Sequence, residues 1–488
     1  METEVLKSKM LSGLKWNSIS LIATRSTDFI VKLILARLLL PESFGVVGMA
    51  MIIINFLTVC SDMGFFHALI QKKDEELREV RYSTVFWYLF LIAVLFVFLF
   101  VFFISPLGAR FYDEPRLEPV LNALSFHLFF CILYTIPRVI LTKQLDFKSL
   151  TRITYSGTIL SSVIAITMAF LNFGVWSLVA KSLVGSSVIC FSYWLKVGWR
   201  PKFIFHFKSF KELARYSFFT QVTALLFYFR NILDYLIIGK LVSAHMLGIY
   251  TLAYTLTETL KSQLYTIFGK VFFPIYSKIQ DDKSKIKHYY LKIMHATAVL
   301  TFPISFFFIG LSENIIMLFF GERWIEAAVP LRILSFASII FSISGTSGEV
   351  LKSIGKPSAG FYMHIANTFI IALPLIYFGQ VYFGLAGVAG AVCIHSFVSR
   401  MVFHTFMKKY IGLTNKDVYD TLKKPFMAAL FMLCAIFLVN SFGLSLLPNF
   451  ILASLSGVIV YCTILFDDLS DIVTHIRKRR TAAAPVSA

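Results

Sequence analysis

The sequence predicts an all-α, polytopic membrane protein, and three observations support that prediction. Apolar residues occupy 57% of the 488 positions. Charged residues occupy 15%, against roughly 25% in soluble domains. The apolar runs are about 20 residues long, the length of a membrane-spanning helix and about twice that of an outer-membrane strand. These features exclude an ordinary soluble enzyme, a disordered chain and a coiled coil.

Apolar windows separated by charged or turn-rich breaks predict about fourteen spans. The first six cover 13–38, 44–66, 83–104, 118–137, 150–171 and 174–195. The next six cover 215–239, 247–272, 291–311, 330–351, 358–379 and 384–406. The last two cover 425–442 and 448–466. The first, seventh and eighth are the least hydrophobic.

Lysine and arginine residues predict the orientation. With the N-terminus inside, about 34 of the 46 cations lie on the cytoplasmic side and about 5 on the other. Both termini are therefore expected in the cytoplasm. The net charge of +19 then follows from topology and from attraction to anionic lipid, and nucleic acid is not needed as a partner.

Short internal matches predict a duplicated unit. Ala36-Arg37-Leu38, followed by Phe44-Gly45, recurs as Gly239-Lys240-Leu241 followed by Leu247-Gly248, at a spacing of 203. Leu124-Ser125-Phe126 recurs as Leu334-Ser335-Phe336, and Gly174-Val175 as Gly384-Leu385, both at a spacing of 210. Because each unit has an even number of spans, the two copies have the same orientation. We therefore expect two parallel six-helix lobes plus two peripheral C-terminal helices.

The predicted domains follow from these boundaries. They are an N-lobe over 1–199, a basic amphipathic linker on the inner surface over 200–216 and a C-lobe over 217–407. Two extra helices over 408–466 and a basic cytoplasmic tail over 467–488 complete the chain.

Charges inside spans are the candidate site residues, because each costs at least about 2.5–3.5 kcal/mol on insertion and usually faces a cavity or a partner. In the first span, Arg25, Asp28 and Lys32 share one helix face. Further stripes contain Arg230 and Asp234 in the seventh span, and Glu258 and Lys261 in the eighth. Lone charges elsewhere are Lys181, Arg332, Glu349 and Arg400.

Two interpretations of these stripes remain open. One is intra-helix ion pairing of Arg25 with Asp28, Arg230 with Asp234 and Glu258 with Lys261. The other is a hydrated cationic cavity between the lobes, in which Arg25, Arg230, Lys261 and Lys32 bind a phosphate-bearing ligand. In that interpretation Asp28, Asp234 and Glu258 are the candidates for coupling to H⁺ or Na⁺.

The sequence shows no catalytic motif, and its cysteines and histidines do not form a pattern of a site. The sequence has no GxxxxGK[ST], HExxH or GxSxG, so no enzyme activity, metal or cofactor is predicted. The six cysteines occur singly in apolar stretches and are interpreted as buried hydrophobes. His127, His295, His364 and His395 are interpreted as packed, hydrogen-bonded side chains, with a proton relay as the alternative.

An ordered series of short motifs resembles the bacterial Wzx-type oligosaccharide flippases of the multidrug/oligosaccharidyl-lipid/polysaccharide exporter superfamily. The motifs are GLKW at 13–16, LLLPESFG at 38–45, DMGF at 62–65, DYLIIG at 234–239, GIY at 248–250, FGERW at 320–324 and GKP at 355–357. Together they are similar to the colanic-acid or teichuronic-acid exporter branch.

The resemblance implies a substrate and a location. The substrate is an undecaprenyl-pyrophosphate-linked oligosaccharide, moved from the inner to the outer leaflet of the bacterial cytoplasmic membrane for exopolysaccharide or lipopolysaccharide synthesis. It also implies alternating access, cation coupling, and polysaccharide polymerase and other assembly proteins as partners. Only Arg25 lies where the match transfers a pyrophosphate-binding role. Arg230 and Lys261 rest on the helical stripes alone.

Three other functions compete with this one. A multidrug or small-metabolite antiporter shares the fold and is distinguished by transport of small cations. A membrane polysaccharide polymerase or ligase needs a sizeable outer loop, which the sequence does not predict. A non-transporting assembly partner is the third alternative.

Overall fold

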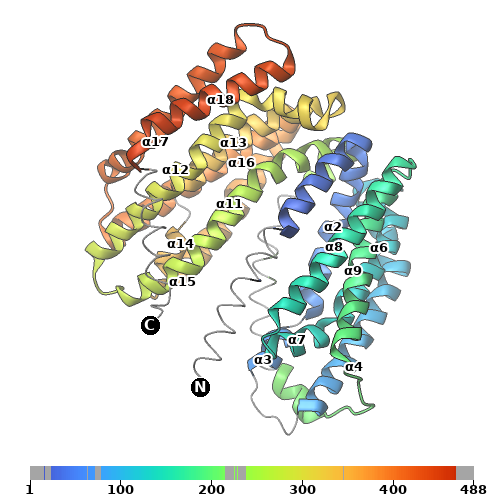
Figure 1. Ribbon diagram of the computed structural model, residues 1–488. Helices are drawn as coiled ribbons and strands as arrows, with labels where there is room; N and C mark the ends of the chain where they lie inside the picture. Colours follow the sequence, from blue (N-terminus) through green and yellow to red (C-terminus); the bar gives the residue numbers. More distant parts are fainter. Residues whose placement is uncertain are drawn as a thin grey trace, which may run out of the picture. The chain divides into compact units, whose positions relative to one another are not determined.

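The computed structural model describes residues 16, 23–62, 64–71, 78–214, 225, 228, 238–343 and 346–468. In these ranges every regular element is a helix, which confirms the predicted fold class. The chain forms two compact units, Met1–Thr251 and Leu252–Ala488. Their boundary falls inside one long helix, α11 (Ala244–Lys278), which therefore begins in the first unit and continues into the second (Figure 1).

The first unit is organised around α6. Its elements are a helix over 23–38, α2 (Pro41–Asp62), α3 (Phe65–Gln71), α4 (Arg78–Leu99), the π-helical turn η1 (Phe100–Ile104), α5 (Ser105–Tyr112), α6 (Leu117–Leu133), α7 (Thr135–Lys143), α8 (Phe147–Phe170) and α9 (Val175–Val197). Helix α6 packs against α2, α4 and α9, and α8 packs against α9. Leu121, Leu124 and Leu128 follow helical spacing along α6 and are completely buried, so they form the core of this unit.

The second unit is organised around α12. Its further elements are α12 (Lys283–Ile315), η2 (Ile316–Phe320), η3 (Glu322–Ala327), α13 (Ala328–Ser342), α14 (Ser347–Ser353), α15 (Pro357–Ala366), η4 (Asn367–Ala372), α16 (Leu373–Ile411), α17 (Asn415–Asn440) and α18 (Leu446–Ile464). Helix α12 packs against α13, α16, α17 and α18. Helices α17 and α18, the two predicted extra spans, lie side by side and both contact α12 (Figure 1).

Two glycines that align in the predicted repeat have the same unusual backbone conformation. Gly174, between α8 and α9, has φ 55° and ψ −126°. Gly384, inside α16, has φ 56° and ψ −141° and divides that helix into two segments. Side chains strongly disfavour this region of φ and ψ. Both positions therefore require glycine, and each glycine joins two consecutive predicted spans at an equivalent place in its unit.

Ten helices in the described part of the chain are long and apolar enough to cross a membrane. One of them, Asn367–Ile411, contains residues 367–379 of the eleventh predicted span and all of the twelfth, which begins at Gly384. The first predicted span is helical from residue 23, the eighth falls within α11, and most of the seventh lies outside the described residues. The helical membrane fold is thus confirmed, while the count of fourteen and the domain limits stay predictions.

Candidate functional site

An ion pair joins two helices of the first unit. The Lys181 ammonium donates a hydrogen bond to Asp28 Oδ1 at 3.0 Å. Asp28 lies on the helix over 23–38 and Lys181 on α9, so the contact links segments 153 residues apart. Arg25 lies one turn before Asp28 on an exposed position and forms no ion pair within the described residues. The intra-helix pairing of Arg25 with Asp28 is therefore not what satisfies this carboxylate.

Lys32 extends the ion pair into a cluster of three charges. It lies one helical turn after Asp28, is half-buried, and interacts electrostatically with both Asp28 and Lys181. The Asp28 and Lys181 side chains are 42% and 24% exposed, so the cluster is accessible to a ligand. The cluster contains two ammonium groups and one carboxylate, which leaves one net positive charge.

Neighbouring helices fix the position of Lys181. Helix α9 begins after Gly174, so Lys181 lies six residues in, about 9 Å along the helix axis. The next residue, Ser182, accepts a hydrogen bond at its carbonyl oxygen from His127 Nδ1 of α6 at 2.9 Å. Because α6 is the central helix of the unit, this contact holds α9 in register with the core.

The other predicted site residues divide into two groups. Arg230 and Asp234 lie outside the described residues, as does the side chain of Lys261, whose backbone belongs to α11. Glu258 is half-buried on α11. The predicted cavity between the lobes therefore stays a prediction, and the cluster of Asp28, Lys32 and Lys181 is the part of the site with defined geometry.

The remaining isolated charges also have partners. Arg332 donates to Glu313 at 2.9 Å, and Lys352 donates to the buried Glu349 at 3.0 Å. The buried Arg400 lies 3.5 Å from the Tyr290 hydroxyl, which is itself 2.8 Å from Ser347 Oγ. Sequence reasoning found no partners for Arg332 and Arg400 because those partners lie on another helix. The pair of Glu349 and Lys352, at i and i+3 of α14, was readable from the sequence and was missed.

Three of the four predicted packed histidines are hydrogen-bonded as expected. His127 contacts the Ser182 carbonyl, and His395 Nε2 lies 3.1 Å from the Asn367 amide. His295 contacts the Thr421 carbonyl at 3.0 Å and Asp468 Oδ1 at 3.2 Å. The His364 side chain lies outside the described part of the structure.

The fold is that of solved membrane exporters. The chain superposes on the lipid II flippase MurJ in an inward closed conformation with a TM-score of 0.75, at 18% identity, covering 93% of this chain and 99% of that one. It superposes on an inward-facing multidrug resistance MATE transporter of the MOP superfamily with a TM-score of 0.63, at 14% identity, covering 82% and 98%. The fold and its long apolar helices define an integral membrane protein with the fold of these transporters.

Sequence comparison defines the family more narrowly. The model of the polysaccharide biosynthesis protein family matches residues 34–330, and the chain belongs to that family. It is 27% identical over 444 residues to the teichuronic acid biosynthesis protein TuaB of Bacillus subtilis, covering 90% of both chains. It is 23% identical over 436 residues to the lipopolysaccharide biosynthesis protein WzxC of Escherichia coli, covering 87% of this chain and 86% of WzxC. The succinoglycan biosynthesis transport protein ExoT of Rhizobium meliloti is 24% identical over 487 residues, covering 97% of both.

Proposed function

We propose that the chain is a flippase that moves an undecaprenyl-pyrophosphate-linked oligosaccharide from the inner to the outer leaflet of the bacterial cytoplasmic membrane. The observation that supports it most directly is the cluster of Asp28, Lys32 and Lys181 within a member of a polysaccharide biosynthesis family. Transport, rather than catalysis, is the role of relatives named as transport proteins or flippases.

The cluster suits a pyrophosphate for electrostatic reasons. An unpaired charge in hydrocarbon is very costly, so the headgroup needs a polar path that provides opposite charge. Two lysines near one carboxylate give such a path an excess of positive charge, and ammonium–phosphate hydrogen bonds are among the strongest in proteins. Asp28 holds Lys181 in place before the ligand arrives and releases it when the pyrophosphate competes for the ammonium.

Alternating access of the two lobes completes the proposed mechanism. The cationic residues Arg25, Lys32, Arg230 and Lys261 line a central cavity, and the polyprenyl tail stays in lipid outside it. Rocking of one lobe against the other exposes the headgroup to each leaflet in turn. Binding of H⁺ or Na⁺ at Asp28, Asp234 or Glu258 biases this equilibrium by its differential affinity for the two states. Both termini lie in the cytoplasm, and polymerase and other assembly proteins act on the flipped product.

Deletion of the gene in its native cell tests this function. We expect undecaprenyl-linked repeat units to accumulate in the inner leaflet and surface polysaccharide to be lost. Re-expression of the wild-type chain restores export, whereas Arg25→Ala and Arg230→Ala variants insert normally and do not. Normal surface polysaccharide after deletion, together with loss of resistance to small organic cations, would identify a multidrug exporter instead.

A further inference from the structure

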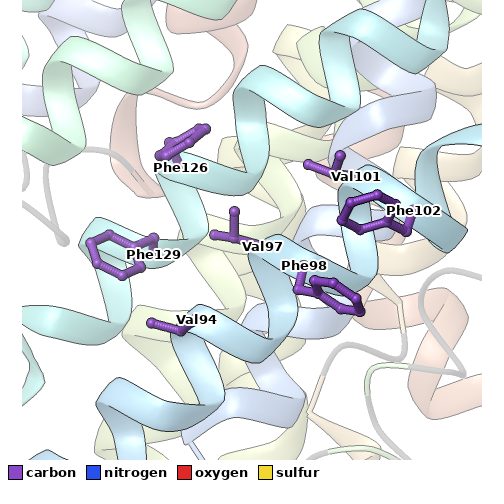
Figure 2. A pocket seen from close by; sticks show the side chains of 7 residues that line it. All are labelled: Val94, Val97, Phe98, Val101, Phe102, Phe126 and Phe129. Carbon is purple, nitrogen blue, oxygen red and sulfur yellow. The ribbon is translucent and has the colours of Figure 1, made fainter.

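A wholly apolar groove runs along the outside of the first unit, between α4–η1 and α6. One wall is a stripe of five side chains between Val94 and Phe102, at positions i, i+3, i+4, i+7 and i+8. Phe126 and Phe129 of α6 form the other wall (Figure 2). The groove encloses about 340 Å³, and the Phe98, Phe102 and Phe126 side chains on its walls are exposed. These residues belong to two helical stretches that are long and apolar enough to cross a membrane, so we expect the groove to open toward lipid.

One end of the same helix is bound to a basic segment, 200–214. The backbone N–H of Lys202 donates to Ser83 Oγ at 3.1 Å, and that of His206 donates to Thr84 Oγ1 at 3.0 Å. Trp87 Nε1 donates to the Lys202 carbonyl at 2.8 Å. Ser83 and Thr84 are completely buried, so these bonds fix the segment firmly against α4.

The fixed segment presents both positive charge and apolar surface. The side chains of Arg200, Lys202 and Lys208 are exposed. Phe203 is 90% exposed, although its ring stacks on that of Trp87 with the ring centroids 4.6 Å apart. Cations flanked by exposed aromatic rings are typical of a surface that contacts lipid headgroups and the adjoining acyl chains.

An aromatic path connects this basic segment with the groove. Phe203 stacks on Trp87. The ring centroids of Trp87 and Phe90 are 5.8 Å apart, and those of Phe90 and Phe129 are 6.3 Å apart. Phe129 is already part of the groove wall. A lipid with its phosphate at Lys202 can therefore lay its hydrocarbon along a continuous apolar surface into the groove.

The position of the groove along the helix favours a long lipid hydrocarbon chain. Val94 lies seven residues beyond Trp87, about 10 Å along the helix, and Phe102 lies fifteen residues beyond it, about 22 Å. The midplane of the hydrocarbon is about 15 Å from either surface. An acyl chain of one leaflet ends near the midplane, so only a chain that continues past it fills the whole groove.

We propose that this groove binds the polyprenyl chain of the lipid-linked substrate, with the phosphate held at Arg200 and Lys202 before the headgroup enters the transport path. The inference rests on the proposed function, which it extends with an entry site on the lipid-facing side of the first unit. Charge complementarity at one end and a wholly apolar lining beyond it fit an anionic lipid whose tail crosses the midplane.

Photolabelling of the full chain tests the proposal. The probe is undecaprenyl phosphate with a photoreactive group in the middle of its chain, reconstituted with the protein in phosphatidylcholine vesicles. We expect labelled peptides from 88–104 and 117–133. The double variant Val94→Trp/Val101→Trp fills the groove with indole rings on exposed positions and lowers the labelling about tenfold. Val163→Trp, a matched exposed position on α8, leaves the labelling unchanged.

Competition and variants at the basic end complete the test. Unlabelled undecaprenyl phosphate abolishes the labelling, and an equal excess of phosphatidylglycerol does not. Lys202→Glu reduces it. Equal competition by phosphatidylglycerol, or labelling unaffected by the two tryptophans, would overturn the groove assignment. Groove labelling in a chain that flips no lipid-linked oligosaccharide would instead overturn the proposed function and leave the binding site standing.

Discussion

Gly45 and Gly248 make reciprocal close contacts where the first turns of α2 and α11 cross within the first unit. A Cβ atom on Gly45 would overlap the carbonyl oxygen of Ala244, and one on Gly248 would overlap the carbonyl oxygen of Pro41. Both pairs of positions, 41 with 244 and 45 with 248, differ by 203, the spacing of the sequence repeat in this region. The two contacts are therefore related by an approximate two-fold axis. Such a relation is expected where equivalent helices of a duplicated unit meet.

The first prediction concerns these glycines. Gly45→Ala and Gly248→Ala should each lower the free energy of unfolding by about 1–3 kcal/mol, because a methyl group meets rigid backbone and no side chain can rotate away. Thermal unfolding of the purified chain measures this. Gly48→Ala is the control on the same helix, since its Cβ would make only ordinary contacts of 3.7 Å and longer. Equal stability of all three variants would contradict the close crossing.

The second prediction separates a ligand site from a structural ion pair. Lys181→Gln should weaken binding of undecaprenyl pyrophosphate about ten- to a hundredfold, because it removes a charged hydrogen-bond donor. Asp28→Asn should strengthen binding, because it removes a negative charge beside the phosphate. Lys240→Gln breaks the exposed Lys240–Asp113 pair of 2.6 Å and serves as the control without effect. If Asp28→Asn and Lys181→Gln change only the free energy of unfolding and leave the affinity for undecaprenyl pyrophosphate unchanged, the ion pair has a structural role alone.

The third prediction concerns pH and the turn between α5 and α6. The Arg116 guanidinium donates hydrogen bonds to Glu114 at 2.7 and 2.9 Å and lowers the pKa of that carboxyl. The stabilisation is complete above the unfolded pKa of about 4.3 and is lost as pH falls through the lower folded pKa. Thermal unfolding between pH 3 and 7, values chosen to bracket the unfolded pKa of about 4.3, should show this acid loss in the wild type.

Arg116→Gln provides the comparison for that pH profile. The variant should lose at most about 1 kcal/mol near neutral pH, because Arg116 is largely exposed and solvent screens its ion pairs. Its stability should fall less steeply with acid than that of the wild type. Parallel pH profiles for the two proteins would rule out the ion pair as the source of the acid sensitivity.

The fourth prediction is topological. Lys283 lies at the start of α12 and Arg323 in η3, directly after the helical stretch Lys283–Phe320 of 38 residues. The backbone is non-helical at Leu311. The part before it, 283–310, is about 42 Å long and exceeds the roughly 30 Å of hydrocarbon, so we expect the two ends of the stretch on opposite sides of the membrane. Cysteines at 283 and 416 should react only after the cell is permeabilised, and cysteines at 116 and 323 should react in intact cells. Labelling of 283 and 323 from the same side is the result that refutes the span assignment.

Composition and local pattern were sufficient to predict most of the fold. Apolar windows placed α2, α4, α6, α8 and α9 correctly, because a span must hide about 20 residues from water whatever it packs against. The repeat match also predicted that Gly174 and Gly384 are equivalent, and the two glycines have similar backbone torsion angles. Such glycines are visible in sequence because no other residue tolerates their torsion angles.

Long-range contacts were not predictable from the same patterns. Helical spacing placed Arg25, Asp28 and Lys32 on one face, and the only partner that it offered for Asp28 was Arg25 on the same helix, as one of two open interpretations. The partner is Lys181 of α9, and its choice depends on how α6 and α9 pack. The one available signal was that Lys181 is the single charge in the interior of its span. The apolar groove was equally invisible, because a lipid-facing wall and a buried helix face have the same composition.

Lipid transport by the purified chain tests the central claim most directly. Wild-type protein is reconstituted into vesicles with undecaprenyl-pyrophosphate oligosaccharide carrying a fluorophore on the sugar, and a membrane-impermeant quencher reports the leaflet of each molecule. We expect the wild type, with an H⁺ or Na⁺ gradient, to move the labelled lipid across the bilayer, and a Lys32→Gln/Lys181→Gln double variant to match protein-free vesicles. Wild-type protein that is folded and inserted yet moves the lipid no faster than protein-free vesicles would contradict the account.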